Sequence, residues 1–376
     1  MRIAVNTRML IDGKMEGIGY FTYETMKRIV VQHPEHEFIF IFDRKFDAEF
    51  IFSKNVTPVS LFPPARHPIL WYLWHEWSLP NLFRKINPDL FISTDGYLSL
   101  SSNVPTVAVF HDLNFEHYPE DVPFFNRIYY RHYFKKYASR AIRIAAVSDF
   151  TKQDIVKTYN INPAKIDVVY NGVSEKFKPV GLEVANEVRG KITGGKPYFL
   201  FVGAMHQRKN IANLMRGFEE FKKTISSPIQ LVLTGQKRWW TSEMEDVYQK
   251  MTFKDEVIFT GRVSEDDLLK ITASAFAVTY VSYFEGFGIP LLEAMKCNVP
   301  LITSNITSMP EIAGDAALFC DPFSVDSIRD AMIRMYNDDE LRFSLIEKGK
   351  QRQSFFSWDK TADDLWKCIE KTIEHG

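Results

Sequence analysis

The chain has 376 residues, 45% of them hydrophobic and 25% charged, a composition that excludes a disordered or collagen-like protein. The 46 Lys and Arg residues balance 47 Asp and Glu, so the formal net charge of −1 gives no footprint for nucleic acid, and we expect no such partner. At roughly 100–200 residues per domain, the length indicates two domains, and the cleft between them is the first place to expect a site.

The three cysteines, Cys297, Cys320 and Cys368, are too few and too scattered for a disulfide framework or a zinc site of four sulfurs. The N-terminal segment MRIAVNTRML lacks the shape of a signal peptide, and no window approaches the roughly 18 apolar residues of a membrane-spanning helix. We therefore expect a cytoplasmic protein that is not integral to a membrane.

Short apolar runs alternate with longer amphipathic stretches along the chain, which predicts βαβ units, mostly parallel sheets and an α/β fold. The helices expected in the first half lie near residues 19–30, 124–137 and 150–158. The strands expected there are 2–6, 37–43, 89–93, 106–111, 143–147 and 167–170.

A break in this pattern between residues 176 and 196 indicates a domain boundary, because the segment lacks a strand and carries Gly and Pro. The strands expected after it are 198–202, 230–234, 257–260, 275–280 and 299–303. We expect two Rossmann-like, doubly wound domains that bind ligands at the carboxyl ends of their strands. The predicted parts are an N-terminal domain at 1–178, a linker at 179–196, a C-terminal domain at 197–357, and a helix at 358–376 that packs back toward the N-terminal domain.

Residues 280–300, YVSYFEGFGIPLLEAMKCNVP, combine a predicted strand end, a glycine-containing loop and a helix start with Pro290 near its first position. Such a helix start leaves free N–H groups at its positive end, beside small residues that let an anion approach. The sequence therefore predicts a phosphate cradle formed by the backbone of Phe287, Gly288, Ile289 and Leu291.

Two glutamates flank this cradle. Glu285 lies in the loop and Glu293 about one turn into the helix, so both can border one ligand as hydrogen-bond acceptors. The alternative is that Glu293 complements the helix dipole and Glu285 caps a turn.

Two cations, Arg208 and Lys209, follow the predicted strand 198–202 and precede a helix that begins at Ile211. At the carboxyl end of a strand they can neutralise a diphosphate, with Arg as a bidentate fork and Lys as a compact charge. A solvated charge pair is the alternative.

His111 and Asp112 come at the end of the apolar strand 106–111, at the carboxyl edge of its sheet. A histidine there can donate or accept near neutral pH, although a structural histidine is the ordinary alternative. We expect Asp112 to fix the loop. The other histidines show no i,i+4 pairing or carboxylate company, so we expect no metal site.

Gly17 and Gly19 in GIGYFT, together with Asp43, resemble part of a dinucleotide fingerprint, which would indicate a dehydrogenase. The first strand ends some ten residues too early, however, and Thr22 occupies the position of the third small residue. We expect instead a loop whose backbone approaches a bound group closely, with a plain helix N-terminal turn as the alternative.

The pattern of two glutamates around Gly-Phe-Gly resembles the signature of retaining nucleotide-sugar glycosyltransferases of the GT-B fold, glycosyltransferase family 4. Further stretches match that family in the same order: MEGIGYFTYETM, FHDLNF, AAVSDFTKQDI, VVYNGV and FVGAMHQRKN. The resemblance covers essentially the whole chain. It implies two Rossmann-like domains and transfer of a hexose from a nucleotide sugar to an acceptor hydroxyl, with retention of anomeric configuration and no obligatory metal or cofactor.

The resemblance also implies roles for the matching residues. Glu285 and the Phe287 and Gly288 amides would hold the sugar hydroxyls, Glu293 the ribose, and His111 the reacting side of the sugar.

Further matching residues would face the phosphates. Gly17 and Gly19 would face the donor diphosphate and the acceptor, and Lys209 matches the family's lysine. Ala204 stands where many relatives carry Arg, so Arg208 must supply the second charge or backbone donors must do more.

The segments RKN and SNITSMPEIAGDAALFCDP (residues 304–322) are most similar to mannosyltransferase-type members that build bacterial surface polysaccharide, including lipopolysaccharide. We therefore expect GDP-mannose as the donor and a saccharide or lipid-linked saccharide as the acceptor. A UDP-hexose transferase is the alternative within the class. A nucleotide-sugar epimerase and a non-catalytic assembly subunit on the same fold are the alternatives outside it.

Two segments, residues 71–85 and 124–140, mix aromatic with basic side chains. Such helices can lie on an anionic membrane surface, although aromatics at helical spacing more often pack in a core. We expect core packing, with peripheral contact at the inner face of the membrane as the alternative. RNA binding is poorly supported because no RNA-binding module accompanies the aromatics.

Overall fold

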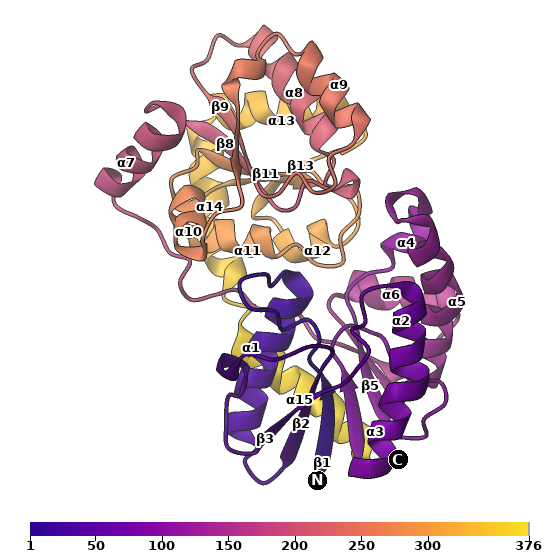
Figure 1. Ribbon diagram of the computed structural model, residues 1–376. Helices are drawn as coiled ribbons and strands as arrows, with labels where there is room; N and C mark the ends of the chain where they lie inside the picture. Colours follow the sequence, from indigo (N-terminus) through magenta and orange to yellow (C-terminus); the bar gives the residue numbers. More distant parts are fainter. Residues whose placement is uncertain (375–376) are drawn as a thin grey trace. The chain divides into compact units, whose positions relative to one another are not determined.

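The computed structural model describes residues 1–374 and divides into two compact units, each built on a parallel sheet (Figure 1). Unit 1 contains Met1–Gly172 and the segment that begins at Ser357, and unit 2 contains Val173–Phe356. Both sheets confirm the predicted α/β class with doubly wound, parallel strands.

The sheet of unit 1 has seven parallel strands within the described residues, in the order β3-β2-β1-β4-β5-β6-β7. Helices cover both faces, so the central strands read as nearly continuous apolar runs rather than as alternating ones. The strands are β1 (Arg2–Asn6), β2 (Glu37–Phe42), β3 (Val56–Ser60), β4 (Leu90–Ser93), β5 (Thr106–Phe110), β6 (Arg143–Ala146) and β7 (Ile166–Val168).

The helices of unit 1 come from both ends of the chain, since the final helix α15, drawn in yellow, lies against α1 and beside β5 and β6 (Figure 1). The helices are α1 (Gly17–Gln32), α2 (Pro68–Leu73), a π-helical turn (Trp74–Ser78), α3 (Leu79–Ile86), α4 (Asn114–His117), α5 (Phe124–Arg140), α6 (Asp149–Tyr159) and α15 (Trp358–Glu374), with 3-10 turns at Ala48–Phe50, Pro119–Asp121 and Pro163–Lys165. No helix within residues 1–374 combines the length and the hydropathy needed to cross a bilayer.

The two passages of the chain between the units lie side by side where they meet unit 1. A Cβ atom at Gly172 would stand 2.2 Å from the backbone N of Trp358, so only glycine permits this approach. The Thr361 hydroxyl donates to the Tyr170 carbonyl (2.7 Å) and fixes the start of α15 beside the end of the first passage.

The sheet of unit 2 has six parallel strands within the described residues, in the order β10-β9-β8-β11-β12-β13. The strands are β8 (Tyr198–Val202), β9 (Gln230–Thr234), β10 (Val257–Gly261), β11 (Ala277–Tyr280), β12 (Leu301–Ser304) and β13 (Ala317–Cys320). The helices are α7 (Leu182–Thr193), α8 (Ile211–Thr224), α9 (Ser242–Lys250), α10 (Glu265–Ala273), α11 (Ile289–Lys296), α12 (Met309–Ala313), α13 (Val325–Asn337) and α14 (Asp339–Gln353), with 3-10 turns at Gln207–Lys209 and Lys254–Glu256.

Three segments differ from the elements expected from sequence. The region 179–196, expected as a linker, holds α7 and belongs to unit 2, because its amphipathic stretch packs on α10 and β10. The strands β3 and β13 were not expected. Both lie at sheet edges, where Pro58 of β3 is tolerated and short segments suffice.

In each unit the strand order reverses once, between β1 and β4 in unit 1 and between β8 and β11 in unit 2. Open α/β sheets bind ligands at the carboxyl ends of the strands at such a reversal. The loops after these four strands are therefore the places to look for chemistry.

Candidate active site

The loop after β8 carries the two predicted cations of unit 2. The chain leaves β8 through Gly203, whose φ of 145° is open to glycine but strained for other residues, and then forms the 3-10 turn Gln207–Lys209. The His206 ring accepts from the backbone N of Arg208 (3.3 Å) and caps this turn. The turn therefore holds Arg208 and Lys209 at the carboxyl edge of the sheet.

Both cations converge on Glu285, which follows the neighbouring strand β11. Arg208 Nη1 donates to Glu285 Oε2 (2.6 Å) and to the Phe284 carbonyl (3.1 Å). Lys209 Nζ donates to Glu285 Oε1 (2.5 Å) and to the Tyr280 hydroxyl, which itself donates to the same carboxylate oxygen (3.0 Å). The sequence separated these residues by more than 70 positions, and the reversal of strand order brings them together.

The charge of this cluster is fixed by its surroundings. Burial alone would raise the pKa of Glu285, but the adjacent Arg208 and Lys209 charges outweigh it and lower that pKa to about 2. Glu285 is therefore ionised at neutral pH, and the cluster carries two positive charges against one negative charge. Both carboxylate oxygens of Glu285 have partners, and the residue is only 5% exposed.

The predicted phosphate cradle forms at the start of α11, with one of its four predicted donors engaged within the loop. Gly288 precedes the helix with a φ of 99°, and a Cβ atom there would stand 2.6 Å from Met309 Cε, so glycine is required. Pro290 has no N–H, and the Leu291 N–H, which was expected to face phosphate, donates to the Gly288 carbonyl (3.0 Å). Within residues 1–374, the N–H groups of Gly288 and Ile289 have no hydrogen-bond acceptor.

The cradle's backbone is held from behind by Ser308, which follows β12. Its hydroxyl contacts the carbonyl oxygens of Glu285 (2.9 Å) and Phe287 (3.2 Å). The Phe287 side chain is buried and meets the Phe356 ring edge-on, so this residue serves the fold as well as the loop.

Glu293 lies on α11, and its pKa is shifted in the opposite direction from that of Glu285. Burial, with a smaller contribution from the Glu265 charge, raises the pKa of Glu293 to about 8. No cation within the described residues pairs with it. Its carboxyl group is thus protonated in a large fraction of molecules at neutral pH.

In unit 1, His111 directly follows β5, as its place in the sequence indicated. Its Nε2 lies 2.8 Å from the Thr94 carbonyl, so Nε2 carries the proton and Nδ1 is the acceptor. Burial lowers the pKa of His111, and the Phe21 ring packs against it edge-on. Asp112 accepts from the backbone N of Asn114 (3.0 Å) and fixes the loop.

Gly17 and Gly19 lie in the first turn of α1, not in the loop that was expected before it. Gly19 is explained by packing, because a Cβ atom there would stand 2.8 Å from the Met9 carbonyl oxygen. Gly17 faces open space, with no atom within 4 Å of the corresponding Cβ position. Of these two glycines, Gly17 therefore retains the features of a position that a ligand can approach.

A buried ion pair that the sequence reasoning missed occupies the strand reversal of unit 1. Arg8 Nε donates to Asp95 Oδ2 (2.5 Å), and the guanidinium lies 4.1 Å from the centre of the Tyr97 ring. Asn6 also donates to Asp95 (2.9 Å), and the burial of His75 next to Arg8 lowers the pKa of that histidine to about 3. The available signal was position, since Arg8 follows β1 and Asp95 follows β4.

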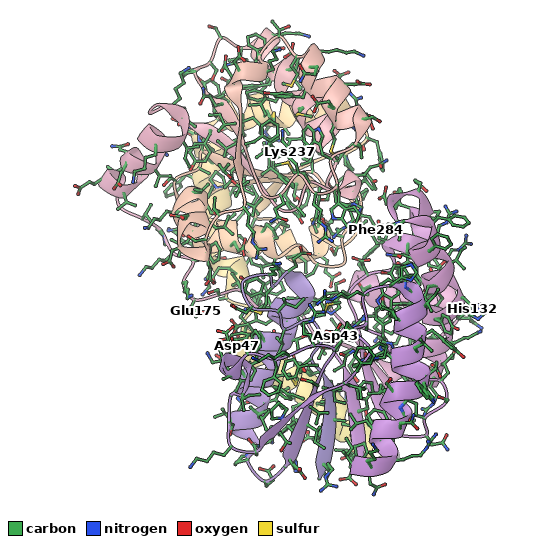
Figure 2. All side chains as sticks on the ribbon, viewed as in Figure 1. Asp43, Asp47, His132, Glu175, Lys237 and Phe284 are labelled. Carbon is green, nitrogen blue, oxygen red and sulfur yellow. The ribbon has the colours of Figure 1, made fainter. Side chains whose placement is uncertain are left out.

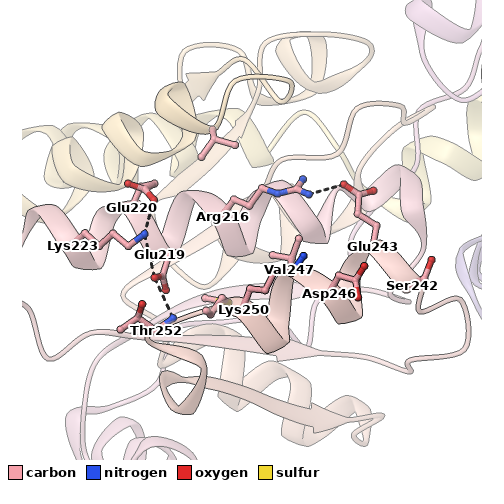
Figure 3. Close-up of a pocket in the computed structure, with 12 residues that line it drawn as sticks. Arg216, Glu219, Glu220, Lys223, Ser242, Glu243, Asp246, Val247, Lys250 and Thr252 are labelled. Atoms are coloured by element: carbon pink, nitrogen blue, oxygen red, sulfur yellow. Dashed lines mark hydrogen bonds and ion pairs between the residues drawn. The ribbon is translucent and has the colours of Figure 1, made fainter.

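A groove of about 620 Å³ between α8 and α9 lies apart from these residues (Figure 3). Its charged side chains pair with one another: Arg216 donates to Glu243 (2.8 Å) and Lys223 to Glu220 (2.9 Å). None of the predicted donor-binding residues lines it.

Two family descriptions match the chain, the first mostly within unit 1 and the second within unit 2. Residues 15–177 match "Glycosyltransferase Family 4" and residues 185–352 match "Glycosyl transferases group 1". The chain belongs to this family of glycosyltransferases, as the sequence resemblance indicated.

Individual relatives agree with this assignment. The chain is 26% identical over 371 residues to "O-antigen chain mannosyltransferase B" of Escherichia coli, covering 96% of this chain and 95% of that one. It is 31% identical over 256 residues to "O-antigen chain mannosyltransferase RfbU" of Salmonella typhimurium, covering 68% and 67%. The structure of sucrose-phosphate synthase from Thermosynechococcus elongatus superposes with a TM-score of 0.80 at 17% identity, covering all of both chains. The fold is therefore GT-B.

Proposed function

We propose that the chain transfers mannose from GDP-mannose to a saccharide, with retention of anomeric configuration, during synthesis of bacterial O-antigen. The observation that carries the chemistry is the cluster of Arg208, Lys209 and Glu285 beside the Gly288 cradle. The observation that favours mannose and O-antigen is the similarity along nearly the whole chain to an O-antigen mannosyltransferase.

The proposed work of unit 2 is to stabilise the leaving group. Breaking the anomeric bond builds negative charge on the diphosphate, and preorganised cations and N–H groups lower the energy of that state. Lys209, Arg208 and the N–H groups of Gly288 and Ile289 would supply these interactions. Transfer by this route needs no metal ion, because fixed protein charges take the place that a cation would hold.

In this scheme Glu285 would act by positioning the two cations, Arg208 and Lys209. In the ligand-free protein its carboxylate holds Arg208 and Lys209 in place, and both of its oxygens are engaged. A bound diphosphate would compete with Glu285 for the same two cations. An oxygen of Glu285 released in this way could accept from a sugar hydroxyl, which is the role that the resemblance implies.

Two further groups complete the proposal. Glu293 would accept hydrogen bonds from the ribose hydroxyls, since it borders the cradle and no cation within the described residues pairs with it. His111 would contact the transferred sugar as a neutral imidazole, because burial lowers its pKa. A neutral ring can hydrogen-bond a hydroxyl without adding charge beside the positive character that develops on the sugar.

Calorimetric titration with GDP, GDP-mannose, UDP and UDP-glucose, each in the presence of chelator, tests the donor assignment. We expect selective binding of the guanine nucleotides and loss of that binding in Lys209→Met. Lys223→Met is the matched control, because Lys223 lies on α8, is half exposed and pairs with Glu219 and Glu220. Selective binding of UDP would transfer the proposal to a UDP-hexose, and no nucleotide binding would refute it.

The helices α2 and α5 favour a lipid-linked acceptor. The buried face of α5 packs in the core through Tyr129, Phe134 and Tyr137, as the aromatic spacing predicted. Its 17 residues include Arg and Lys but no Asp or Glu. Its outer side carries exposed groups such as His132, which points away from the sheet (Figure 2).

Exposed apolar side chains gather at the start of the same helix. Phe124 is 59%, Phe125 67% and Ile128 52% exposed, and Ile69 on the neighbouring α2 is 65% exposed. The helices lie side by side, since the Trp71 ring of α2 stacks on Tyr130 of α5. Apolar groups next to cations are the combination that anionic lipid surfaces bind. We therefore propose that this face rests on the membrane that carries the acceptor.

Flotation with vesicles tests this part of the proposal separately. We expect binding to vesicles that contain an anionic lipid, weaker binding to phosphatidylcholine alone, and loss of binding in the double variant Phe124→Ser, Phe125→Ser. Leu182→Ser is the control, because Leu182 is 81% exposed but lies on α7 of unit 2. Equal flotation of the double variant and the control would refute the membrane face and leave the donor assignment standing.

A further inference from the structure

Three side chains of types that bind metals lie together in the short loop between α1 and β2. This loop precedes its strand, whereas the residues of the candidate active site follow theirs. Glu35 Oε1 is 3.5 Å from His33 Nδ1 and 3.3 Å from His36 Nε2. The three ligand atoms all lie within 4.8 Å of one another. The ligand atoms of a tetrahedral zinc site with bonds of about 2.0–2.1 Å are roughly 3.3 Å apart. Two of the three distances therefore already suit one bound ion.

The backbone of this loop is held in place by a single side chain. Asn55 Nδ2 donates to the carbonyl oxygens of His33 (3.2 Å), His36 (3.0 Å) and Val30 (3.0 Å). Pro34, between the ligands, further restricts the backbone. Because Asn55 joins the carbonyl groups of both histidines, little conformational freedom is left to lose when the loop binds an ion.

The two imidazole rings are also fixed. The Trp366 ring of α15 stacks on His33 with ring centres 3.6 Å apart, and lies 5.4 Å from the His36 ring. The two histidine rings are nearly parallel, with an interplanar angle of 10°.

We infer that His33, Glu35 and His36 bind one zinc ion, with water completing its coordination. Two imidazole nitrogens and one carboxylate oxygen are ligands that suit Zn²⁺, whereas Mg²⁺ and Ca²⁺ prefer oxygen ligands throughout. The ion would fix the α1–β2 loop. The His33 ring of this loop stacks on Trp366 of α15, which lies more than 300 residues further along the chain. The site is independent of the proposed transfer reaction. The sequence predicted no carboxylate beside these histidines, whereas Glu35 contacts both of them.

Zinc titration of the full chain, freed of any histidine tag and treated with chelator, tests the inference. We expect one saturable site for Zn²⁺ and none for Mg²⁺. His36→Gln and Glu35→Gln should each weaken binding about tenfold or more, since even the loss of a supporting partner has that effect.

His132→Gln is the matched control, because His132 is exposed on α5 of the same unit and its Nε2 contacts Lys136 rather than a carboxylate. It should bind zinc as the wild type does. Circular dichroism will show that the variants are folded. No saturable zinc binding, or equal binding by the wild type and Glu35→Gln, would overturn the site and show that the contacts are only hydrogen bonds between His and Glu.

Discussion

Replacing Glu293 with Gln should stabilise the protein, and the gain should increase with pH. The pKa of Glu293 is raised from its ordinary 4.5 to about 8, mainly by burial. Between these two values the folded state holds a proton that the unfolded state has lost, so the free energy of unfolding falls as pH rises. At about 1.4 kcal/mol per pKa unit, the cost is about 1 kcal/mol at pH 5 and about 3 kcal/mol at pH 7. A neutral amide of similar size avoids that cost.

Urea unfolding of the wild type and Glu293→Gln at pH 5 and pH 7, followed by circular dichroism, measures the effect. We expect the stability difference between the two proteins to be about 2 kcal/mol larger at pH 7. Glu265→Gln should reduce the pH dependence without abolishing it, because the Glu265 charge is the smaller cause of the shift. A stability difference that is the same at both pH values would refute the assignment of a raised pKa.

Four other substitutions, each followed by urea unfolding, probe the site residue Glu285, the first turn of α1 and the boundary between the units. Glu285→Gln should destabilise by about 3 kcal/mol, because it leaves two cations facing each other without a carboxylate, and the loss should shrink as pH falls from 4.5 toward 2. Gly19→Ala should destabilise by about 1–3 kcal/mol through its clash with a main-chain carbonyl, whereas Gly17→Ala should not destabilise; equal effects would refute the packing argument. Gly172→Ala should destabilise strongly, since its Cβ would meet the Trp358 backbone; a neutral result would contradict the close approach.

The strands of the two sheets could be predicted well because buried parallel strands are short apolar runs with clear ends. The exceptions have physical reasons. β3 contains Pro58, which argues against a central strand and is tolerated only because β3 lies at an edge. The helix α7 was hidden by glycines, of which Gly194 proves to end the helix in a left-handed conformation and not to mark a flexible linker.

The site was predictable in its positions but not in its pairing. Arg208, Lys209 and Glu285 were each placed at a strand's carboxyl end, which is a local property of the sequence. Their convergence depends on β8 and β11 being neighbours, which no local pattern encodes. The Leu291 amide was misjudged because its acceptor, the Gly288 carbonyl, depends on the left-handed conformation of that glycine.

The buried ion pairs at the two strand reversals differ in net charge, and this difference bears on which ligand each unit could bind. Buried pairs contribute little stability over apolar residues of the same size, so a site is a better reason than stability for keeping them. In unit 1 the Arg8 charge is cancelled by Asp95, and the nearby His75 is neutral. In unit 2 two cations share one carboxylate, so the edge of that sheet keeps a positive charge. The positive edge of unit 2 supports the proposed binding of a diphosphate there.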